Sequence, residues 1–599
     1  MITLLFSLSS SKKFDVLFKN VTLIDGTGSL PQKEMYVGIN GKKIQYIGKQ
    51  TKHTGKKEID GTGFVLTPGF FDAHAHLDEV PFLEPNFTFQ INQGITSIVT
   101  GICGVSAAPT RMDKNSNHYN YLLLDRVKEW FKDPPTTFKH YYDYLDKTKF
   151  AVNTIPMLGH SNVRDLLVGN VNVTFNETMM QKARDMVEEA MQAGAFGLTA
   201  GLMYYPSGYA NVYEMAELCK VVNKYGGIFM NHMRSESDYF IEAVEETLEI
   251  GRKSGCPVQI HHMKTCGERN MNKSYKAIRM IDEARAKGQD VTVDQYPYLM
   301  ANTDLSAILP PWALEGTPDD VSKRINDTKL REKIIGEVMD REHILYDNYW
   351  VSSGSPSKIV ITRGAPSEMM GKNLVELSGK TDEREVLEWT LDLIARGITP
   401  LANFYAINEK DMLNIMPKDY VMMGSDSDVY YEGYGATVQH PRNMASHSIF
   451  LRKYVKELDV LSLEKAINKM SGLIADRFGI SDRGKVFVGN YADLNMFKLD
   501  EINDTTKETG WTWPSTGMKY VMNSGEFLID DYKMTGNLPG KGLRKTDYVN
   551  QKKSINWTII LLDIAIGLLV IGCIAMLIFI LIKRKKSPQQ YTDINSQIM

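Results

Sequence analysis

The sequence has little of what marks several large classes of protein. Its 599 residues include only five cysteines, which are too few and too scattered for a disulfide framework. The net charge of −3 gives no basic field, so nucleic acid is not an expected partner. No glycine-rich dinucleotide loop follows the first apolar strand, which disfavours an open doubly wound sheet. With 43% hydrophobic residues, the chain can nevertheless bury a large core in more than one unit.

One long apolar run stands near the C-terminus. The stretch WTIILLDIAIGLLVIGCIAMLIFILI, residues 557–582, contains Asp563 as its only charged residue and is followed at once by KRKK. This length and this basic stop predict a transmembrane helix. The positive-inside rule then places a cytosolic tail at 583–599 and the large domain outside the cell or in a lumen. The alternative is a tail anchor of opposite orientation.

Two further features bear on export. Residues 1–13 make a weak signal segment, because the apolar core is short and no basic residue precedes it. Eight N-x-S/T sequons give modest support for an exported glycoprotein. They begin at Asn20, Asn86, Asn172, Asn176, Asn272, Asn326, Asn503 and Asn556.

The pattern of apolar and polar residues along the chain changes twice. Alternating apolar and polar residues with glycine turns at 14–67 and again at 475–535 predict one composite β-sandwich domain built from both chain ends. Between them, residues 68–474 alternate short apolar strands with longer amphipathic stretches, interrupted at about 305–360 by an insertion. Residues 536–556 read as a juxtamembrane linker.

Eight strand candidates lie in the central region: FVLTPGFFDAHAH, TSIVTGICG, VNTIPMLGH, AFGLTAG, GIFMNHMRSE, PVQIHHMK, DVTVDQYPY and YVMMGSDSD. Eight strands with intervening helices predict an α/β fold, a closed (β/α)8 TIM-like barrel whose chemistry sits at the carboxyl ends of the strands.

Ligand-type residues end several of these strands. His74 and His76 stand one residue apart, so on a strand their imidazoles face the same side. The same strand ends carry Cys103, His160, His232, His262 and Asp426. Each has an ordinary explanation, as a core histidine, a buried thiol or a helix cap, but their convergence indicates a metal site. His261 is expected to point to the other side of its strand and to be structural.

These residues lie in motifs by which the chain, from about residue 15 to 500, resembles the N-acyl-D-amino-acid deacylases (D-aminoacylases) of the amidohydrolase superfamily. The matching stretches are LIDGTG, TPGFFDAHAH, GICGVSAAP, GHSNVR, GLTAGLMYYPSG, NHMRSE, HHMK, DQYPY, LPPW, GSDSD, HPR and DRGKVFVGNYADLNMF. The resemblance implies one tight zinc held by Cys103, His232 and His262. It also implies a second, weaker position at His74 and His76, with Cys103 as the bridge.

The resemblance also implies the reaction. A bound divalent metal lowers the pKa of a water molecule and polarises an amide carbonyl. Asp426 would accept the proton of that water and deliver it to the departing amine. The small-molecule substrate would be an N-acyl amino acid of D configuration, with Lys264, Tyr296, Arg442 and Tyr204 as candidate binding residues.

Departures from the family pattern affect specificity. LMANTD follows YPY, so Asn302 or Thr303 would replace a small hydroxyl residue, and SDVYYEGYG enlarges a loop before HPR. Two alternatives to a deacylase are a cyclic-amide hydrolase of hydantoinase or dihydroorotase type and a non-catalytic surface receptor. The oligomeric state is left open by the sequence.

Overall fold

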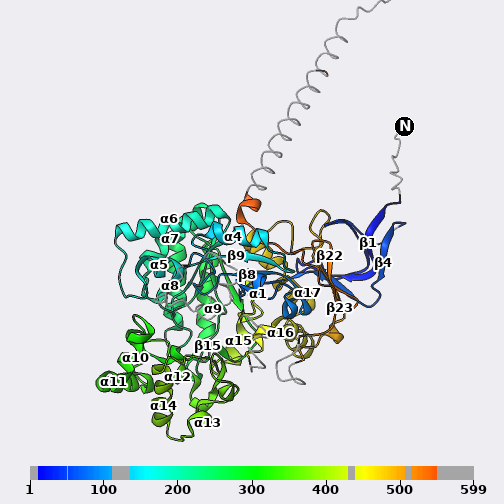
Figure 1. The fold of residues 1–599 in the computed structure, drawn as a ribbon. Helices are drawn as coiled ribbons and strands as arrows, with labels where there is room; N and C mark the ends of the chain where they lie inside the picture. Colours follow the sequence, from blue (N-terminus) through cyan, green and yellow to red (C-terminus); the bar gives the residue numbers. More distant parts are fainter. Residues whose placement is uncertain are drawn as a thin grey trace, which may run out of the picture. The chain divides into compact units, whose positions relative to one another are not determined.

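The computed structural model describes residues 11–49, 52–110, 135–428, 439–505, 514–549 and 576. The chain divides into two units, Met1–Lys545 and Thr546–Met599, and the elements discussed here all belong to the first (Figure 1).

A parallel barrel forms the centre of the first unit. Two sheets make it, in the orders β6-β8-β9 and β10-β11-β12-β13-β14-β18, and every pairing in them is parallel. Only Met157 separates β9 from β10, so the described residues form eight barrel strands. The strands are β6 (Phe70–Asp72), β8 (Ile95–Thr100), β9 (Asn153–Pro156), β10 (Leu158–Gly159), β11 (Gly197–Gly201), β12 (Ile228–His232), β13 (Val258–Ile260), β14 (Val291–Gln295) and β18 (Val421–Met423).

Backbone hydrogen bonds close the barrel. Ala73 N–H donates to Met423 O at 3.1 Å between the last strand and the first, and Phe196 N–H donates to Pro156 O at 3.0 Å. The predicted α/β barrel is therefore confirmed. All eight predicted stretches contribute a barrel strand, because each is an apolar run of strand length between turn signals.

Helices surround the barrel, and most of them are amphipathic and bury one face. In α6, Asn176 caps the start by accepting from Met179 N–H, Gly194 ends the helix at φ 117°, and Met180 and Val187 are buried. The helices that follow the barrel strands are α4 (Phe138–Lys147), α5 (His160–Val168), α6 (Glu177–Ala193), α7 (Val212–Lys224), α8 (Phe240–Ser254), α9 (Lys273–Ala286), α15 (Glu409–Ile415), α16 (Arg442–Ile449), α17 (Leu463–Lys469) and α18 (Gly472–Phe478).

A nine-stranded sheet joins the two ends of the first unit. Its order is β23-β22-β21-β20-β5-β1-β2-β3, with β4 paired to β1. β20 pairs antiparallel with β5, which only Gly69 separates from the first barrel strand. The strands are β1 (Lys13–Leu23), β2 (Gln32–Asn40), β3 (Lys43–Gly48), β4 (Thr54–Asp60), β5 (Val65–Pro68), β20 (Leu494–Phe497), β21 (Met518–Asn523), β22 (Glu526–Asp530) and β23 (Lys533–Met534).

A segment with its own apolar core interrupts the barrel between β14 and β18. It contains an antiparallel sheet, β15-β17-β16, and a group of helices drawn in green in Figure 1. The elements are β15 (Ala301–Asp304), β16 (Ile359–Arg363), β17 (Leu401–Phe404), α10 (Pro318–Asn326), α11 (Thr328–Met339), α12 (Tyr349–Ser353), α13 (Leu374–Ser378) and α14 (Glu383–Ala395).

Residues 540–545, within the stretch predicted as a linker, pair with the barrel. Thr154 N–H donates to Lys541 O at 3.0 Å, and Leu543 N–H donates to Thr154 O at 2.8 Å. Leu543 is buried. This part of the chain belongs to the folded unit.

The prediction of a membrane span requires correction. None of the helices in the described part of the chain is long and apolar enough to cross a membrane. The longest of them, α6, has 17 residues and includes charged ones, whereas a span needs about 20 predominantly apolar residues. The prediction of a transmembrane helix is therefore wrong. The prediction of a single-pass membrane protein with an external or lumenal domain depended on that helix and is wrong as well. Residues 557–582, apart from Met576, the tail 583–599 and residues 1–10 lie outside the described residues.

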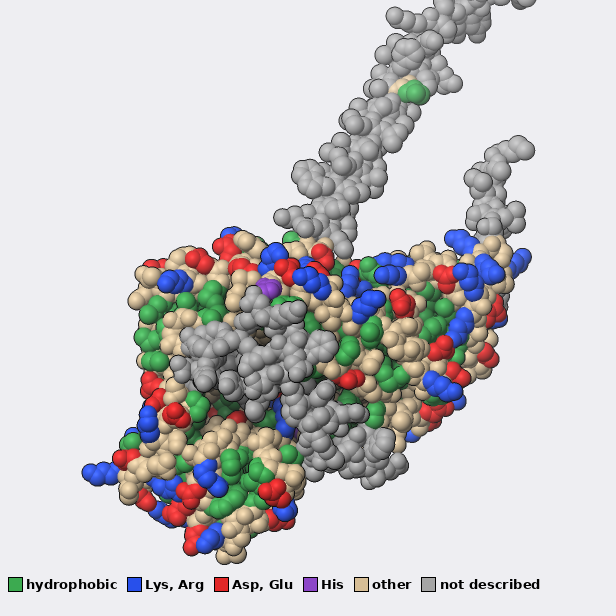
Figure 2. All heavy atoms as spheres, viewed as in Figure 1, with side chains coloured by type: hydrophobic (Ala, Val, Ile, Leu, Met, Phe, Trp, Pro, Cys, Tyr) green, Lys and Arg blue, Asp and Glu red, His purple; other side chains and the backbone are tan. Residues whose placement is uncertain are grey.

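Charge is mixed over the surface. Figure 2 shows Lys and Arg side chains interspersed with Asp and Glu over the displayed face. This mixture on the displayed face agrees with the net charge of −3.

Candidate metal centre

Side chains at the carboxyl ends of five barrel strands meet at one place. His74 and His76 follow β6, Cys103 follows β8, and His232 ends β12. His262 follows β13 and Asp426 follows β18. The fold thus brings together the predicted metal ligands and the predicted general base, because parallel barrel strands all end at the same rim.

The loop that carries Cys103 lies tightly against its neighbours. Gly101 has φ 74°, and a Cβ there would lie 2.0 Å from Met157 O, so no side chain fits. Thr199 Oγ1 accepts from Gly104 N–H at 3.1 Å and donates to Gly101 O at 2.6 Å. The GICG motif is therefore what allows the sulfur to approach the strand ends.

Three of the site residues have a backbone conformation that non-glycine residues rarely adopt. The φ angles are 49° at Cys103, 28° at His262 and 55° at Asp426. Such left-handed conformations cost free energy and gather at functional sites, where the surrounding structure holds them.

Four imidazoles surround the sulfur of Cys103. Its Sγ lies 3.4 Å from His74 Nε2, 3.4 Å from His262 Nε2, 3.7 Å from His232 Nδ1 and 3.5 Å from His261 Nδ1. A tetrahedral zinc with usual bond lengths holds its sulfur and nitrogen donors about 3.5 Å apart. The group Cys103, His232 and His262 therefore has the donor types and the spacing of a zinc site.

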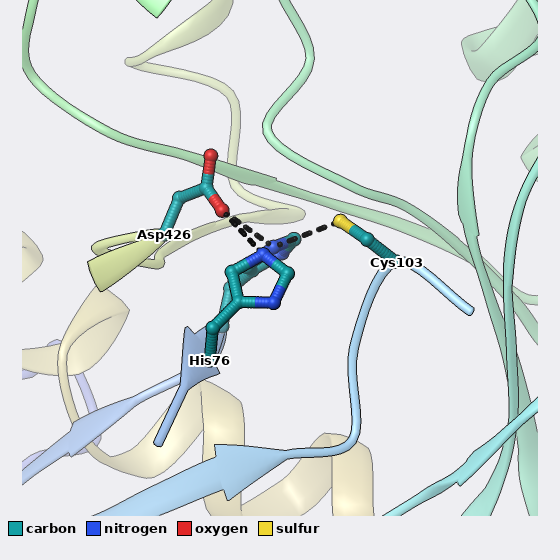
Figure 3. Close-up of side chains that lie close together, drawn as sticks. His76, Cys103 and Asp426 are labelled. Carbon is teal, nitrogen blue, oxygen red and sulfur yellow. Dashed lines mark hydrogen bonds and ion pairs between the residues drawn. The ribbon is translucent and has the colours of Figure 1, made fainter. Parts of the chain in front are cut away.

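A second group shares Cys103. His74, His76, Cys103 and Asp426 also lie within ligand distance of one another. Asp426 Oδ1 is 3.2 Å from His74 Nε2 and 3.1 Å from His76 Nε2. Figure 3 shows His76, Cys103 and Asp426 converging from separate elements. The arrangement offers two adjoining metal positions with one thiolate between them.

The charges of this cluster suit a cation. Burial would raise the pKa of the Cys103 thiol, but the imidazoles of His74, His262 and His261 hold it well below its usual value. Burial would likewise raise the pKa of Asp426, but Arg442, His262 and His74 hold that pKa well below its usual range. Thiolate and carboxylate are therefore the stable forms, which gives the cluster two anionic donors for a cation.

Two residues missed by the sequence reasoning belong to the site. His261 does not point away, because β13 ends at Ile260 and strand alternation stops there. Asp294, buried on β14, lies 3.0 Å from His74 Nδ1 and accepts from His262 N–H at 2.7 Å. A carboxylate on the outer ring nitrogen orients a ligand histidine. The motif DQYPY carries Asp294 and was the available signal.

Glu236 was also missed, four residues after His232 in NHMRSE. It is buried, and its Oε1 lies 2.8 Å from His262 Nδ1 and 2.6 Å from Lys264 Nζ. Burial would raise its pKa, but Lys264 and the imidazoles of His262 and His232 lower it below the usual range. Glu236 is therefore an anion behind the predicted metal ligands His232 and His262.

The predicted substrate-binding residues line the same region. Arg442 Nη1 donates to Asp426 Oδ2 at 2.5 Å, and its guanidinium lies 5.4 Å from the ring centre of Tyr296. Lys264 Nζ lies 5.3 Å from the same ring. The Tyr296 hydroxyl is buried and has no hydrogen-bond partner among the described residues. The ring of Tyr204 contacts that of His232 at a tilt of 58°, with ring centres 4.7 Å apart.

The structure describes the residues of one departure from the family pattern, Asn302 and Thr303, and little of the other. Thr303 Oγ1 donates to the Tyr204 hydroxyl at 3.0 Å. Asn302 instead binds Asn403 Oδ1 at 2.8 Å, within the interrupting sheet, and its carbonyl accepts from Arg442. Most of the enlarged loop before HPR lies outside the described residues.

His160 does not join the cluster. Its Nδ1 lies 2.8 Å from Ser207 Oγ and its Nε2 lies 3.0 Å from Glu214 Oε1, in a buried network with Arg164. It ends a barrel strand but begins α5, which turns its side chain towards α7.

A closed parallel barrel with adjoining Cys/His metal positions and a carboxylate at the strand ends defines a metal-dependent amidohydrolase. D-aminoacylase of Alcaligenes xylosoxydans xylosoxydans is 30% identical to this chain over 542 residues, 90% of this chain and 99% of the relative. The chain belongs to the N-acyl-D-amino-acid deacylase (D-aminoacylase) family of amidohydrolases. No family model matches it.

Two solved structures are similar over their full length. One is D-aminoacylase, studied for the functional role of its binuclear metal centre, with a TM-score of 0.74 and 27% identity over 89% of this chain and 100% of that one. The other is N-acyl-D-glutamate deacylase from Bordetella bronchiseptica complexed with zinc and a phosphonate inhibitor, with a TM-score of 0.73 and 27% identity over the same shares.

Proposed function

We propose that this protein is a zinc-dependent hydrolase that cleaves the amide bond of N-acyl-D-amino acids, giving a carboxylic acid and a free amino acid. The observation that carries the proposal is the position of the Cys103 sulfur, 3.4 Å from His262 Nε2 and 3.7 Å from His232 Nδ1, at the carboxyl ends of barrel strands that also hold Asp426. The family of the chain supports linear deacylation over the hydrolysis of cyclic amides.

The donor set fits zinc. Cys103, His232 and His262 would hold one ion tightly, and His74 and His76 would hold a second, weaker ion that shares Cys103. When bound, the metal polarises the amide carbonyl and lowers the pKa of a water molecule.

Asp426 would move the proton. Its Oδ2 is fixed by Arg442, which leaves Oδ1 directed at His74 and His76. Because Asp426 is held ionised, it can take a proton from the attacking water and pass it to the nitrogen of the leaving amine.

The carboxylate of the substrate needs cationic and hydroxyl donors beside this carbonyl position. Arg442, Lys264 and the unpartnered Tyr296 hydroxyl supply them, and Tyr204 would pack against the bound substrate. The D configuration is supported by the family, and the acyl group and side chain accepted are left to measurement.

Release of amine from matched N-acetyl D- and L-amino acids and from hydantoins, with and without a chelator, tests the proposal. We expect release from the D compounds, loss of activity with the chelator and its recovery on adding zinc. Hydrolysis of hydantoins alone, or activity that a chelator does not affect, would overturn it.

A further inference from the structure

We propose that Glu236 is a positioning residue that fixes the tautomer of His262, so that Nε2 is free to ligate a metal, against competition from Lys264. The inference rests on the proposed function for the identity of the ligands. It goes beyond that function by assigning a role to a residue outside both metal groups.

The contacts of His262 pose the problem. Its Nδ1 lies 2.8 Å from Lys264 Nζ and 2.8 Å from Glu236 Oε1, while its Nε2 lies 3.4 Å from Cys103 Sγ. A neutral imidazole carries one proton. If Lys264 donates to Nδ1, the proton must sit on Nε2, which then cannot bind a metal. If Nδ1 donates to Glu236, Nε2 keeps its lone pair.

Glu236 decides this competition. Its Oε1 accepts from Lys264 Nζ at 2.6 Å, which engages one of the three ammonium hydrogens, and it is close enough to His262 Nδ1 to accept the Nδ1 proton as well. The same carboxylate lies 4.0 Å from His232 Nε2, the outer nitrogen of the other histidine in this group. One buried anion therefore stands behind both histidines and beside a predicted substrate cation.

The surrounding structure holds Glu236 in place. The Tyr349 hydroxyl, from the interrupting segment, donates to Oε2 at 3.2 Å. Asp347 accepts from Ser235 Oγ and Glu236 N–H, both at 3.1 Å, and from Ser237 Oγ. Asparagine at position 347 keeps a carbonyl oxygen as an acceptor and touches neither imidazole, so Asp347→Asn is a matched control for the loss of a buried carboxylate near this loop.

The test measures zinc binding without turnover. Zinc affinity is determined by chelator competition for wild type, Glu236→Gln, Lys264→Met, the double variant and Asp347→Asn. Removing a carboxylate that orients a metal ligand typically weakens metal binding 10–100-fold. We expect a loss of about 10-fold or more in Glu236→Gln, a smaller loss in the double variant, and affinities within about twofold of wild type in Lys264→Met and Asp347→Asn.

A folded Glu236→Gln variant that binds zinc within twofold of wild type overturns the inference. Glu236→Gln leaves Lys264 buried without its partner, so this variant could fail to fold. In that case the double variant is compared with Lys264→Met. Weaker zinc binding by the double variant supports the inference, and equal zinc binding overturns it. The absorption of the cobalt-substituted proteins reports the coordination change separately. None of these measurements requires hydrolysis. The zinc affinities can therefore still be interpreted if the protein lacks the proposed activity.

Discussion

At the scale of single residues, the site is made by side chains whose backbone is strained. Cys103, His262 and Asp426 all have positive φ, and each stands immediately beyond or near the end of a barrel strand. The strain turns these side chains towards one centre rather than along the strand. Strand alternation placed His261 on the wrong side because β13 ends at Ile260, where the alternation stops.

Replacing Cys103 by alanine should abolish tight metal binding. The thiolate is the donor common to both groups, so we expect zinc to fall from about one equivalent to well below one after dialysis. Cys219→Ala, at a buried thiol on α7, is the control and should keep its zinc. Equal zinc in the Cys103 variant and wild type would exclude this residue as a ligand.

Replacing Asp426 by asparagine should separate binding from chemistry. The amide can still accept from Arg442 but cannot take a proton, so turnover should fall by about 10²-fold or more. Zinc content of the purified variant should match wild type. Retained turnover would assign the proton transfer to another group.

At the scale of elements, the interrupting segment is attached to the barrel beside the metal ligands. Asp347 accepts three hydrogen bonds from residues 235–237, which follow β12, and Tyr349 reaches Glu236. The segment is thus tied to the loop that follows His232.

This attachment should depend on pH. Burial, together with the nearby charge of Glu236, raises the pKa of Asp347 to about 6, although hydrogen bonds from Ser237 oppose the rise. A raised carboxyl pKa means that the folded state binds the proton more tightly, so stability is lost as pH rises from about 4 through about 6. The difference from the unfolded value corresponds to up to about 3 kcal/mol.

The side chain in Asp347→Asn does not ionise, so this variant should not lose stability in this way as the pH rises. Its free energy of unfolding relative to wild type should therefore improve between pH 4.5 and pH 7, as measured by urea unfolding. An unchanged difference across this range would show that Asp347 does not titrate there.

At the scale of the whole molecule, distant parts of the chain close the first unit. β20 pairs with β5, and residues 540–545 pair with the barrel near β9. The described residues of this unit therefore depend on contacts between its two ends.

Two truncations test where the folded unit ends. A chain ending at residue 549 keeps every contact of the first unit and the buried Tyr548, and should keep its stability within about 0.5 kcal/mol. A chain ending at residue 536 loses the backbone hydrogen bonds of Lys541 and Leu543 and the burial of Leu543. It should lose about 3–6 kcal/mol. Equal unfolding midpoints of the two chains would mean that residues 537–549 do not stabilise the unit.

The sequence by itself determined the eight barrel strands and the ligand types at their ends. Periodicity is local, and an apolar run before a histidine or a cysteine can be recognised without knowing its neighbours. The family motifs further indicated which of those residues belong to the same predicted metal position. The one long apolar run, by contrast, misled the interpretation, since hydropathy alone predicted a membrane span that the structure does not uphold.

Only the tertiary structure decided the surroundings of the ligands. It placed His160 with Glu214 rather than with the metal ligands and turned His261 towards Cys103. It also set Asp294 and Glu236 behind the ligand histidines. The reason is physical. Which ring nitrogen of a histidine faces a metal depends on carboxylates that other strands bring close to it. Those distances cannot be derived from a local sequence pattern.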